Sequence, residues 1–239
     1  MKTDKKQNTA GAKSSAKFRK VCWVLVSLTA AILLVIVLLL YKPAGYSCPE
    51  VIGADSKNRE VSSYLTHELL PQIYNGAQRA ESFDLLVSQK GINHAIAGST
   101  WPKEYDGITF LAPQVFFTAE HIVLMGTANL GGVEFVVSVE AEPAIDEQGM
   151  LNLRVAKVMV GAVNITPLAR VIAQSSYRKK LEEKGIAANP LRAKIAASLL
   201  NNEPFEPVFK VPGDGQKVRA DKITITNGKL VIHLVPVYD

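Results

Sequence analysis

The four histidines of this 239-residue chain, His67, His94, His121 and His233, are its best candidates for acid–base or metal chemistry. They fall on separate predicted elements and lack the spacing of metal ligands. His121 lies opposite Glu142 in a predicted hairpin, which we interpret as a polar cross-strand pair rather than an acid–base couple. The chain contains no G-x-S-x-G, G-x-x-x-x-G-K or H-E-x-x-H motif and no paired cysteine motif. We therefore predict no catalytic residue, no metal, no cofactor and no enzyme activity.

Positive charge is concentrated in residues 1–20, which we predict to be a basic cytoplasmic tail. This tail holds seven lysines and arginines against one aspartate, a net charge of +6, whereas the whole chain carries +5. The remaining residues are therefore nearly neutral, at −1. Because a domain that binds nucleic acid carries its basic residues on the folded surface, we predict no nucleic-acid partner.

An uncharged, apolar segment of 21 residues, 21–41, follows the basic tail. As a helix it would span roughly 31 Å, about the thickness of a bilayer's hydrocarbon core. A cleaved signal peptide has a shorter apolar region with small residues at the cut, so we predict an uncleaved single transmembrane helix. The lysines and arginines before it predict a cytoplasmic N-terminus. The rest of the chain would then be extracytoplasmic, either periplasmic or at the cell surface.

The two cysteines give little information about the compartment. Cys22 starts the predicted span and Cys48 follows it, so they lie farther apart than the ~7 Å that a disulfide can bridge. Cys48 is then either a free thiol or paired between two chains.

Residues 42–55 predict a linker, because prolines and glycines interrupt any regular structure there. Residues 56–239 form the predicted extracytoplasmic domain. Its first segment, 56–80, repeats apolar residues every four positions and predicts a helix. Pro71 lies inside this helix and is expected to kink or split it.

The centre and the end of the domain predict antiparallel hairpins. With Gly131-Gly132 as the turn, strand pairs such as Leu124–Val139 and Ile122–Ala141 are all apolar or glycine, and the opposite side is mostly polar. Asn227-Gly228 is a favoured two-residue turn and gives the C-terminal hairpin a similar apolar side. A slip of one residue would destroy both patterns. The segment 99–107 is interpreted as a loop.

Two helices are predicted between these hairpins, at 166–184 and 189–200. Thr166 and Pro167 are typical of a helix start, and the apolar stripe of the first helix (Leu168, Val171, Ile172, with Ser175) is expected to face inward. The apolar corner before it, 155–165, predicts a buried crossover that sends the helix back across the sheet. The alternation changes phase near Lys157, through either a β-bulge or cover on both faces.

The strands and the helix 166–184 present a large apolar surface. The fold class is predicted as α+β, with a curved antiparallel sheet packed against one or two helices. Patterning alone leaves open whether this surface is a filled core or an apolar groove for a ligand. The candidate ligand-binding residues are Ile122, Leu124, Phe135, Val137, Val139, Leu151, Leu153, Val155, Leu168 and Ile172.

The order of elements carries a family resemblance. An N-terminal anchor precedes "FDLLVSQKGIN" (83–93), a strand meander follows, and "VMVGAVNITPLA" (158–169) leads into a helix and a final hairpin. This layout resembles small membrane-anchored bacterial proteins of the YpmS-like kind and, more distantly, tubular lipid-binding (TULIP-like) domains. The resemblance covers roughly 81–239. It implies a long helix in the concave face of a curved sheet, and the handling of lipids or hydrophobic ligands at the cell envelope.

Two functions follow as hypotheses. The first is a non-enzymatic, membrane-anchored envelope protein that binds or passes a lipid or another hydrophobic ligand. The second is a structural or assembly subunit that binds another envelope protein through a sheet edge or the 56–80 helix. The ligand, the protein partner and the oligomeric state do not follow from the sequence.

Overall fold

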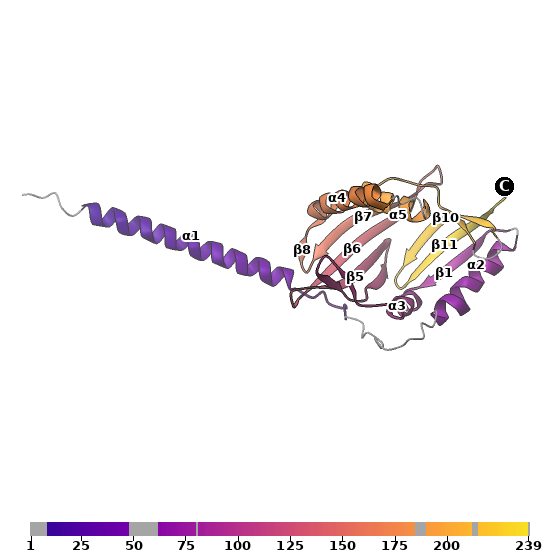
Figure 1. Ribbon diagram of the computed structural model, residues 1–239, viewed down its shortest axis with the longest axis horizontal. Helices are drawn as coiled ribbons and strands as arrows, with labels where there is room; N and C mark the ends of the chain where they lie inside the picture. Colours follow the sequence, from indigo (N-terminus) through magenta and orange to yellow (C-terminus); the bar gives the residue numbers. More distant parts are fainter. Residues whose placement is uncertain (1–8, 48–61, 80, 185–189, 212–214, 239) are drawn as a thin grey trace, which may run out of the picture.

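The computed structural model describes residues 9–47, 62–79, 81–184, 190–211 and 215–238. Its first element is a long helix, α1 (Thr9–Leu39), which stands away from the rest of the chain (Figure 1). Among the described residues, α1 is the one helix long and apolar enough to cross a membrane, over Lys20–Leu39. These 20 residues span roughly 30 Å at about 1.5 Å per residue. The predicted apolar helix is thus confirmed, although it ends at Leu39 rather than at residue 41.

The end of α1 packs directly against the folded domain. The backbone N–H of Ala162 donates a hydrogen bond of 2.8 Å to the carbonyl of Leu38. The neighbouring Gly161 has a φ of +56°, and a Cβ atom there would lie 2.4 Å from the carbonyl oxygens of Leu38 and Leu39. Only glycine combines this backbone conformation with so close an approach.

The start of the predicted linker also contacts the domain. The hydroxyl groups of Tyr46 and Thr127 are hydrogen-bonded at 2.9 Å, and Lys42 forms an ion pair with Glu134 at 3.3 Å. Residues 42–47 therefore hold the end of α1 beside the sheet. The rest of the predicted linker, including Cys48, lies outside the described residues.

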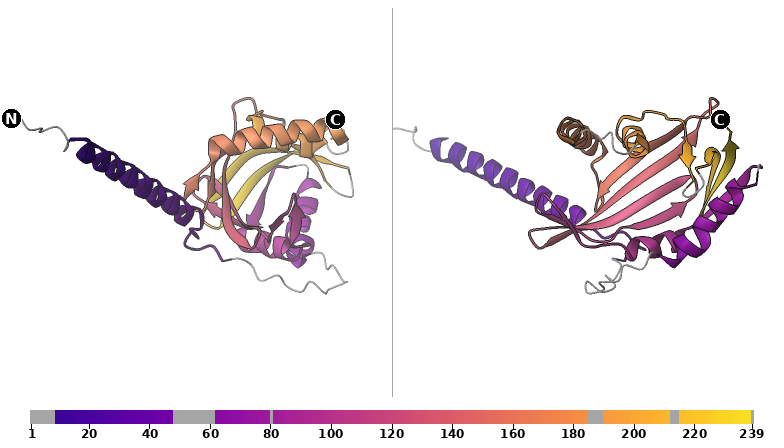
Figure 2. Two further views of the ribbon diagram at one scale, coloured as in Figure 1. Left: turned by 60° about the vertical axis from the view of Figure 1, so that its left-hand side comes forward. Right: turned by 45° about the vertical axis from the view of Figure 1, so that its right-hand side comes forward.

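A large antiparallel sheet forms most of the domain. Its strands follow the order β2-β3-β5-β6-β7-β8, and β4 also pairs with β5. The strands are β2 (Lys103–Tyr105), β3 (Ile108–Phe110), β4 (Gln114–Thr118), β5 (His121–Leu130), β6 (Val133–Ile145), β7 (Leu151–Val160) and β8 (Val163–Asn164). The sheet is open and curved (Figure 2).

The predicted register of the β5–β6 hairpin is confirmed, including the pairs Leu124–Val139 and Ile122–Ala141. The change of phase near Lys157 arises from a bulge. Lys157 pairs with Glu140 and Val155 pairs with Ala141, which leaves Ala156 as the extra residue. The bulge returns the apolar residues on both sides of it to one face of the sheet.

A second, smaller sheet was not foreseen, because we predicted a single sheet. Its order is β1-β11-β10-β9. The strands are β1 (Phe83–Ser88), β9 (Val208–Lys210), β10 (Lys217–Thr226) and β11 (Lys229–Val237). The predicted C-terminal hairpin is confirmed, with Ile225 opposite Leu230 and Ile223 opposite Ile232. Its partner β1 comes from the start of the domain, with Phe83 opposite Leu234.

The segment 99–107, which we interpreted as a loop, contains β2 and the turn into β3. Tyr105 pairs with Ile108 around Asp106-Gly107. Both turn residues have positive φ, at +49° and +74°, as a two-residue hairpin turn requires, and Asp-Gly is among its favoured sequences. The strands on either side have only three residues each, so the sequence shows too little alternation there to indicate a hairpin.

The remaining helices lie around the two sheets (Figure 1). They are η1 (Tyr64–Leu69), α2 (Leu70–Ala77), α3 (Gln89–Ala97), α4 (Thr166–Lys184) and α5 (Pro190–Asn201). Pro71 splits the predicted 56–80 helix as expected, since a wide π-helical segment ends at Leu69 and an α-helix begins at Leu70. Residues 56–61 of the predicted helix lie outside the described residues.

A cluster of buried apolar side chains lies at the end of the domain away from α1 (Figure 1). They come from the small sheet, α2 and β4, and Ile122 and Ile145 of the large sheet pack against them. The buried cluster comprises Ala77, Leu85, Val87, Phe117, Val211, Val218, Ala220 and Leu234. This cluster therefore closes one end of the large sheet. The other end, toward α1, is left open.

The contact between Gly161 and α1 can be tested with a matched pair of glycines. Gly131 has a similar φ of +58°, but no atom lies within 4 Å of the position of its Cβ. In both Gly161→Ala and Gly131→Ala, alanine takes a left-handed conformation at a cost of about 1–2 kcal/mol, but only the first meets backbone oxygens. We expect Gly161→Ala to lower the melting temperature of the full-length chain more than Gly131→Ala. Equal shifts would contradict the packing of this turn on α1.

Candidate functional site

The apolar face of the large sheet is the first candidate site. We define it as the side of β5, β6 and β7 that carries eight of the predicted ligand-binding residues: Ile122, Leu124, Phe135, Val137, Val139, Leu151, Leu153 and Val155. The strand registers bring all eight together. Across the strands, Leu124, Val139 and Val158 form one row, and Ile122, Ala141 and Val155 form the next.

Most of this apolar face is only half-buried. Leu151 and Val158 are buried, but Leu124 keeps 40% of its surface exposed. The other members of the face fall between these limits. In a filled core these side chains would be almost completely buried. The face therefore lacks a full cover over its middle strands.

The position of α4 explains the missing cover. The predicted crossover over the sheet is wrong, since β8 pairs with β7 and α4 then runs along the outer edge of β7 (Figure 2). Arg170 donates to the carbonyl of Val155, and Gln174 to the carbonyl of Leu200 in α5. These two residues lie on one side of α4, which is the side that the domain contacts.

The apolar stripe of α4 faces away from the domain, contrary to the prediction. Leu168 and Ile172 are 57% and 54% exposed, and Val171 lies exposed between them. At about 3.6 residues per turn, this stripe is opposite the side that carries Arg170. Leu168 and Ile172, the last two predicted ligand-binding residues, therefore do not cover the apolar face.

Two hydroxyl groups hold the helices at the edge of β7. The backbone N–H of Val158 donates to Oγ1 of Thr166 at 2.8 Å, and the backbone N–H of Leu153 donates to Oγ of Ser198 at 2.8 Å. Thr166 was predicted as the helix cap, but its side chain bonds to the strand instead. The repeat of apolar residues in the sequence does not predict these hydrogen bonds from backbone N–H groups to side chains.

Other strand edges are covered in the same way. The N–H groups of Leu86 and Ser88 in β1 donate to side chains of Gln72 and Tyr64. On β4, Asn93 of α3 both accepts from and donates to the backbone of Val115. These long edges are thus protected against pairing with another chain.

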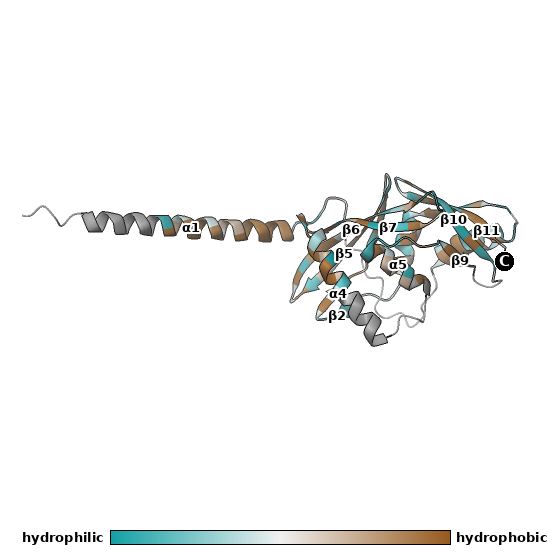
Figure 3. Ribbon diagram, turned by 90° about the horizontal axis from the view of Figure 1, so that it is seen from above, coloured by the Kyte–Doolittle hydropathy of each residue, from teal (hydrophilic) through white to brown (hydrophobic). Residues whose placement is uncertain are grey.

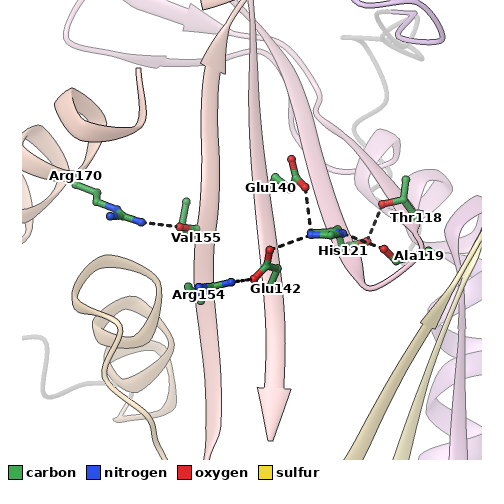
Figure 4. Close-up of polar contacts among 8 residues, drawn as sticks. All are labelled: Thr118, Ala119, His121, Glu140, Glu142, Arg154, Val155 and Arg170. Atoms are coloured by element: carbon green, nitrogen blue, oxygen red, sulfur yellow. Dashed lines mark hydrogen bonds and ion pairs between the residues drawn. The ribbon is translucent and has the colours of Figure 1, made fainter. Parts of the chain in front are cut away.

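A cluster of charged residues on the opposite face of the sheet is the second candidate site (Figure 4). Nε2 of His121 lies 3.0 Å from Glu142 and 3.3 Å from Glu140, and Nδ1 lies 2.9 Å from the carbonyl oxygen of Ala119. Arg154 forms an ion pair with the other oxygen of Glu142. The predicted cross-strand pair of His121 and Glu142 is confirmed.

The electrostatics of this cluster favour its charged form. The pKa of His121 is raised, first because the ring bonds to the carbonyl of Ala119 and second because it bonds to Glu142. Only the imidazolium ion can donate from both ring nitrogens. The pKa of Glu142 is lowered, first by the hydrogen bond from Arg154 and then by that from His121.

An open cleft of about 550 Å³ lies beside this cluster, between the two sheets. It is lined by Glu120, His121, Glu142, Pro143, Ile223, Thr224 and Ile225. His121 and Glu142, which both line this cleft, are hydrogen-bonded to each other at 3.0 Å. Among the described residues, no group of three or more His, Cys, Asp or Glu side chains could hold a metal ion.

The His121 pair predicts a pH dependence of stability. The unfolded pKa of a histidine is about 6.5, and the folded value of His121 is higher. Its stabilising contribution is therefore complete below pH 6.5 and is lost as the pH rises through the folded pKa. We expect His121→Gln to remove this loss from thermal unfolding curves recorded between mildly acidic and mildly alkaline pH.

His67, an exposed histidine of η1, provides the control. His67→Gln should keep the pH dependence of the wild type. If His121→Gln keeps it as well, the hydrogen bonds of His121 do not raise its pKa in solution.

The chain was also compared with known proteins. No protein-family model matches it, and neither does any curated protein.

Proposed function

We propose that this protein is a non-enzymatic, membrane-anchored protein of the cell envelope whose apolar sheet face holds or passes a lipid or another hydrophobic ligand. The observation that carries the proposal is the half-buried apolar face. It spans β5, β6 and β7, and the helices that could cover it are attached to the edge of β7 instead.

The physical argument is the free-energy cost of exposing apolar surface to water. Monomeric proteins rarely expose contiguous apolar patches larger than a few hundred Å², and larger ones mark binding sites. Burying apolar area is favourable by about 25 cal/mol per Å², or about 0.8 kcal/mol per methylene group. An acyl chain laid along Leu124, Val137 and Val139 would gain this free energy with every methylene that it buries.

The anchor supports a membrane ligand over one dissolved in water. We infer that α1 spans the membrane, with the basic tail in the cytoplasm and the domain outside. Because α1 packs against the turn at Gly161, the domain stays within reach of the bilayer. Such tethering raises the effective concentration of lipid at the apolar face.

The resemblance to YpmS-like proteins and TULIP-like domains points in the same direction, but α4 departs from it. That resemblance implies a helix in the concave face of the sheet, whereas α4 lies along the edge of β7. We therefore base the proposal on the apolar face rather than on the family pattern.

A protein partner is the second candidate function. At the edges of β1 and β4, side chains already occupy backbone groups, so strand pairing there is a poor route to such a partner. The surface of α2 is more suitable, since Leu70 and Tyr74 are exposed there. They line a cleft of about 320 Å³.

A photoactivatable fatty acid, added to the full-length chain in phospholipid vesicles, tests the first function. We expect cross-links on peptides of β5, β6 and β7, as well as on α1. Leu124→Gln should reduce the cross-links on the sheet several-fold. Leu86→Gln is the matched control, because Leu86 lies on β1 and is 43% exposed, against 40% for Leu124.

Peptide mapping by mass spectrometry decides the outcome. Cross-links confined to α1, with none on the sheet, would contradict the ligand-binding proposal and favour a protein partner. Equal losses in Leu124→Gln and Leu86→Gln would mean that the substitution acts through folding rather than through the apolar face.

A further inference from the structure

The end of the large sheet next to α1 carries a row of apolar side chains. Tyr105 pairs with Ile108, Ile108 with Leu130, and Leu130 with Val133, so four adjacent strands each contribute one residue. Leu130 and Val133 are 53% and 45% exposed, and Tyr105 is similarly exposed. Exposed apolar side chains gathered in one place mark an interaction surface, and Leu130 and Val133 at the tip of the β5–β6 hairpin are such side chains.

The exposed stripe of α4 lies at the same end of the domain. The helix begins directly after β8, which contacts α1, and its stripe of Leu168, Val171 and Ile172 falls in the first two turns. Figures 1 and 3 show the start of α4 and the β2, β5 and β6 ends grouped beside the end of α1. We call the row and the stripe together the apolar rim.

The position of α1 determines which surface the rim meets. Its last turn contacts Gly161 and Ala162 after β7. On β6, Val137 is level with Val160 at the end of β7, and the strand continues for four more residues to Val133. At about 3.3 Å per residue, the hairpin tip projects roughly 13 Å further along the strand. If α1 spans a bilayer, the tip lies at the level of its surface.

We propose that the apolar rim is inserted in the interface of the membrane that α1 spans, so that the apolar face opens onto the bilayer and takes its lipid from it. This inference rests on the proposed function and names the source of the ligand. An amphipathic helix that lies in this interfacial layer buries its apolar face about 5–10 Å deep. The rim lies next to the contact between α1 and the domain. This position favours the membrane as its partner over a soluble protein or a second copy of the chain.

The apolar face connects the rim to the closed core, with one covered stretch between them. The rim residues Leu130 and Val133 are exposed, Leu124 is 40% exposed further along β5, and Ile122 packs against the closed core. Between Leu130 and Leu124, Ala128 is buried and Pro113 lies 3.6 Å from the position of a Cβ atom at Gly126. An acyl chain entering at the rim would therefore pass beside Pro113 to reach Leu124. It would stop where Phe117 and the small sheet close the far end.

Site-specific labels test the insertion. Cysteines at Leu130 and Ile172, in a full-length chain with Cys22→Ser and Cys48→Ser, would each carry an environment-sensitive fluorophore. In vesicles of phosphatidylethanolamine and phosphatidylglycerol, we expect blue-shifted emission and quenching by nitroxide lipids at both positions. A label at Leu86, which is also exposed (43%) but lies in the small sheet, should remain accessible to water.

The transfer step needs a second measurement. Leu130→Ser with Ile172→Ser should reduce cross-links of a photoactivatable fatty acid to β5–β7 at least twofold when vesicles supply the fatty acid. The same double variant should match the wild type when the fatty acid is supplied without vesicles. Both positions are exposed, and an unchanged melting temperature would confirm that the fold is intact.

The outcomes separate the two proposals. If the labels at Leu130 and Ile172 are as accessible to water as the label at Leu86, the insertion is overturned, even if cross-links on the sheet persist. A blue shift that grows with protein density and resists nitroxide lipids would assign the rim to a second copy and also overturn it. Quenched labels without any cross-link on the sheet would support the insertion and contradict the ligand-binding function.

Discussion

The outer edge of β7 has to find partners for its backbone N–H groups, and the arrangement of the domain depends on how it does so. Thr166 and Ser198 accept from Val158 and Leu153, and both hydroxyl groups are buried. A buried N–H without a partner costs about 1–3 kcal/mol, so these bonds hold α4 and α5 firmly at the edge. Two helices that could have covered the apolar face are thereby kept beside it.

This arrangement divides the domain into a closed end and an open end. The small sheet, α2 and β4 bury the apolar side chains at the far end. Toward α1, the same face passes through the half-exposed Leu124 to the exposed tip at Leu130 and Val133. The apolar surface thus points from a closed core toward the helix that can cross a membrane. The proposed lipid-handling role follows from this direction rather than from any single residue.

The sequence by itself determined the features that depend on neighbouring residues. The registers of the β5–β6 and β10–β11 hairpins follow from an alternation of period two and from turns of Gly-Gly and Asn-Gly. The apolar α1 follows from composition and length alone. The split at Pro71 follows from its missing N–H. Asp106-Gly107 belongs to the same class of local signal, and the hairpin that it makes was within reach of the sequence.

Only the tertiary structure decided which surfaces are covered. An apolar stripe shows which side of a helix is apolar but not what packs on it, so Leu168 and Ile172 were assigned to the wrong side. The hydroxyl of Ser198 reaches a strand 45 residues away, and β1 pairs with β11 across almost the whole domain. Such contacts depend on the summed geometry of many elements. Local periodicity therefore predicts the apolar face itself, while its opening toward α1 follows only from the three-dimensional arrangement.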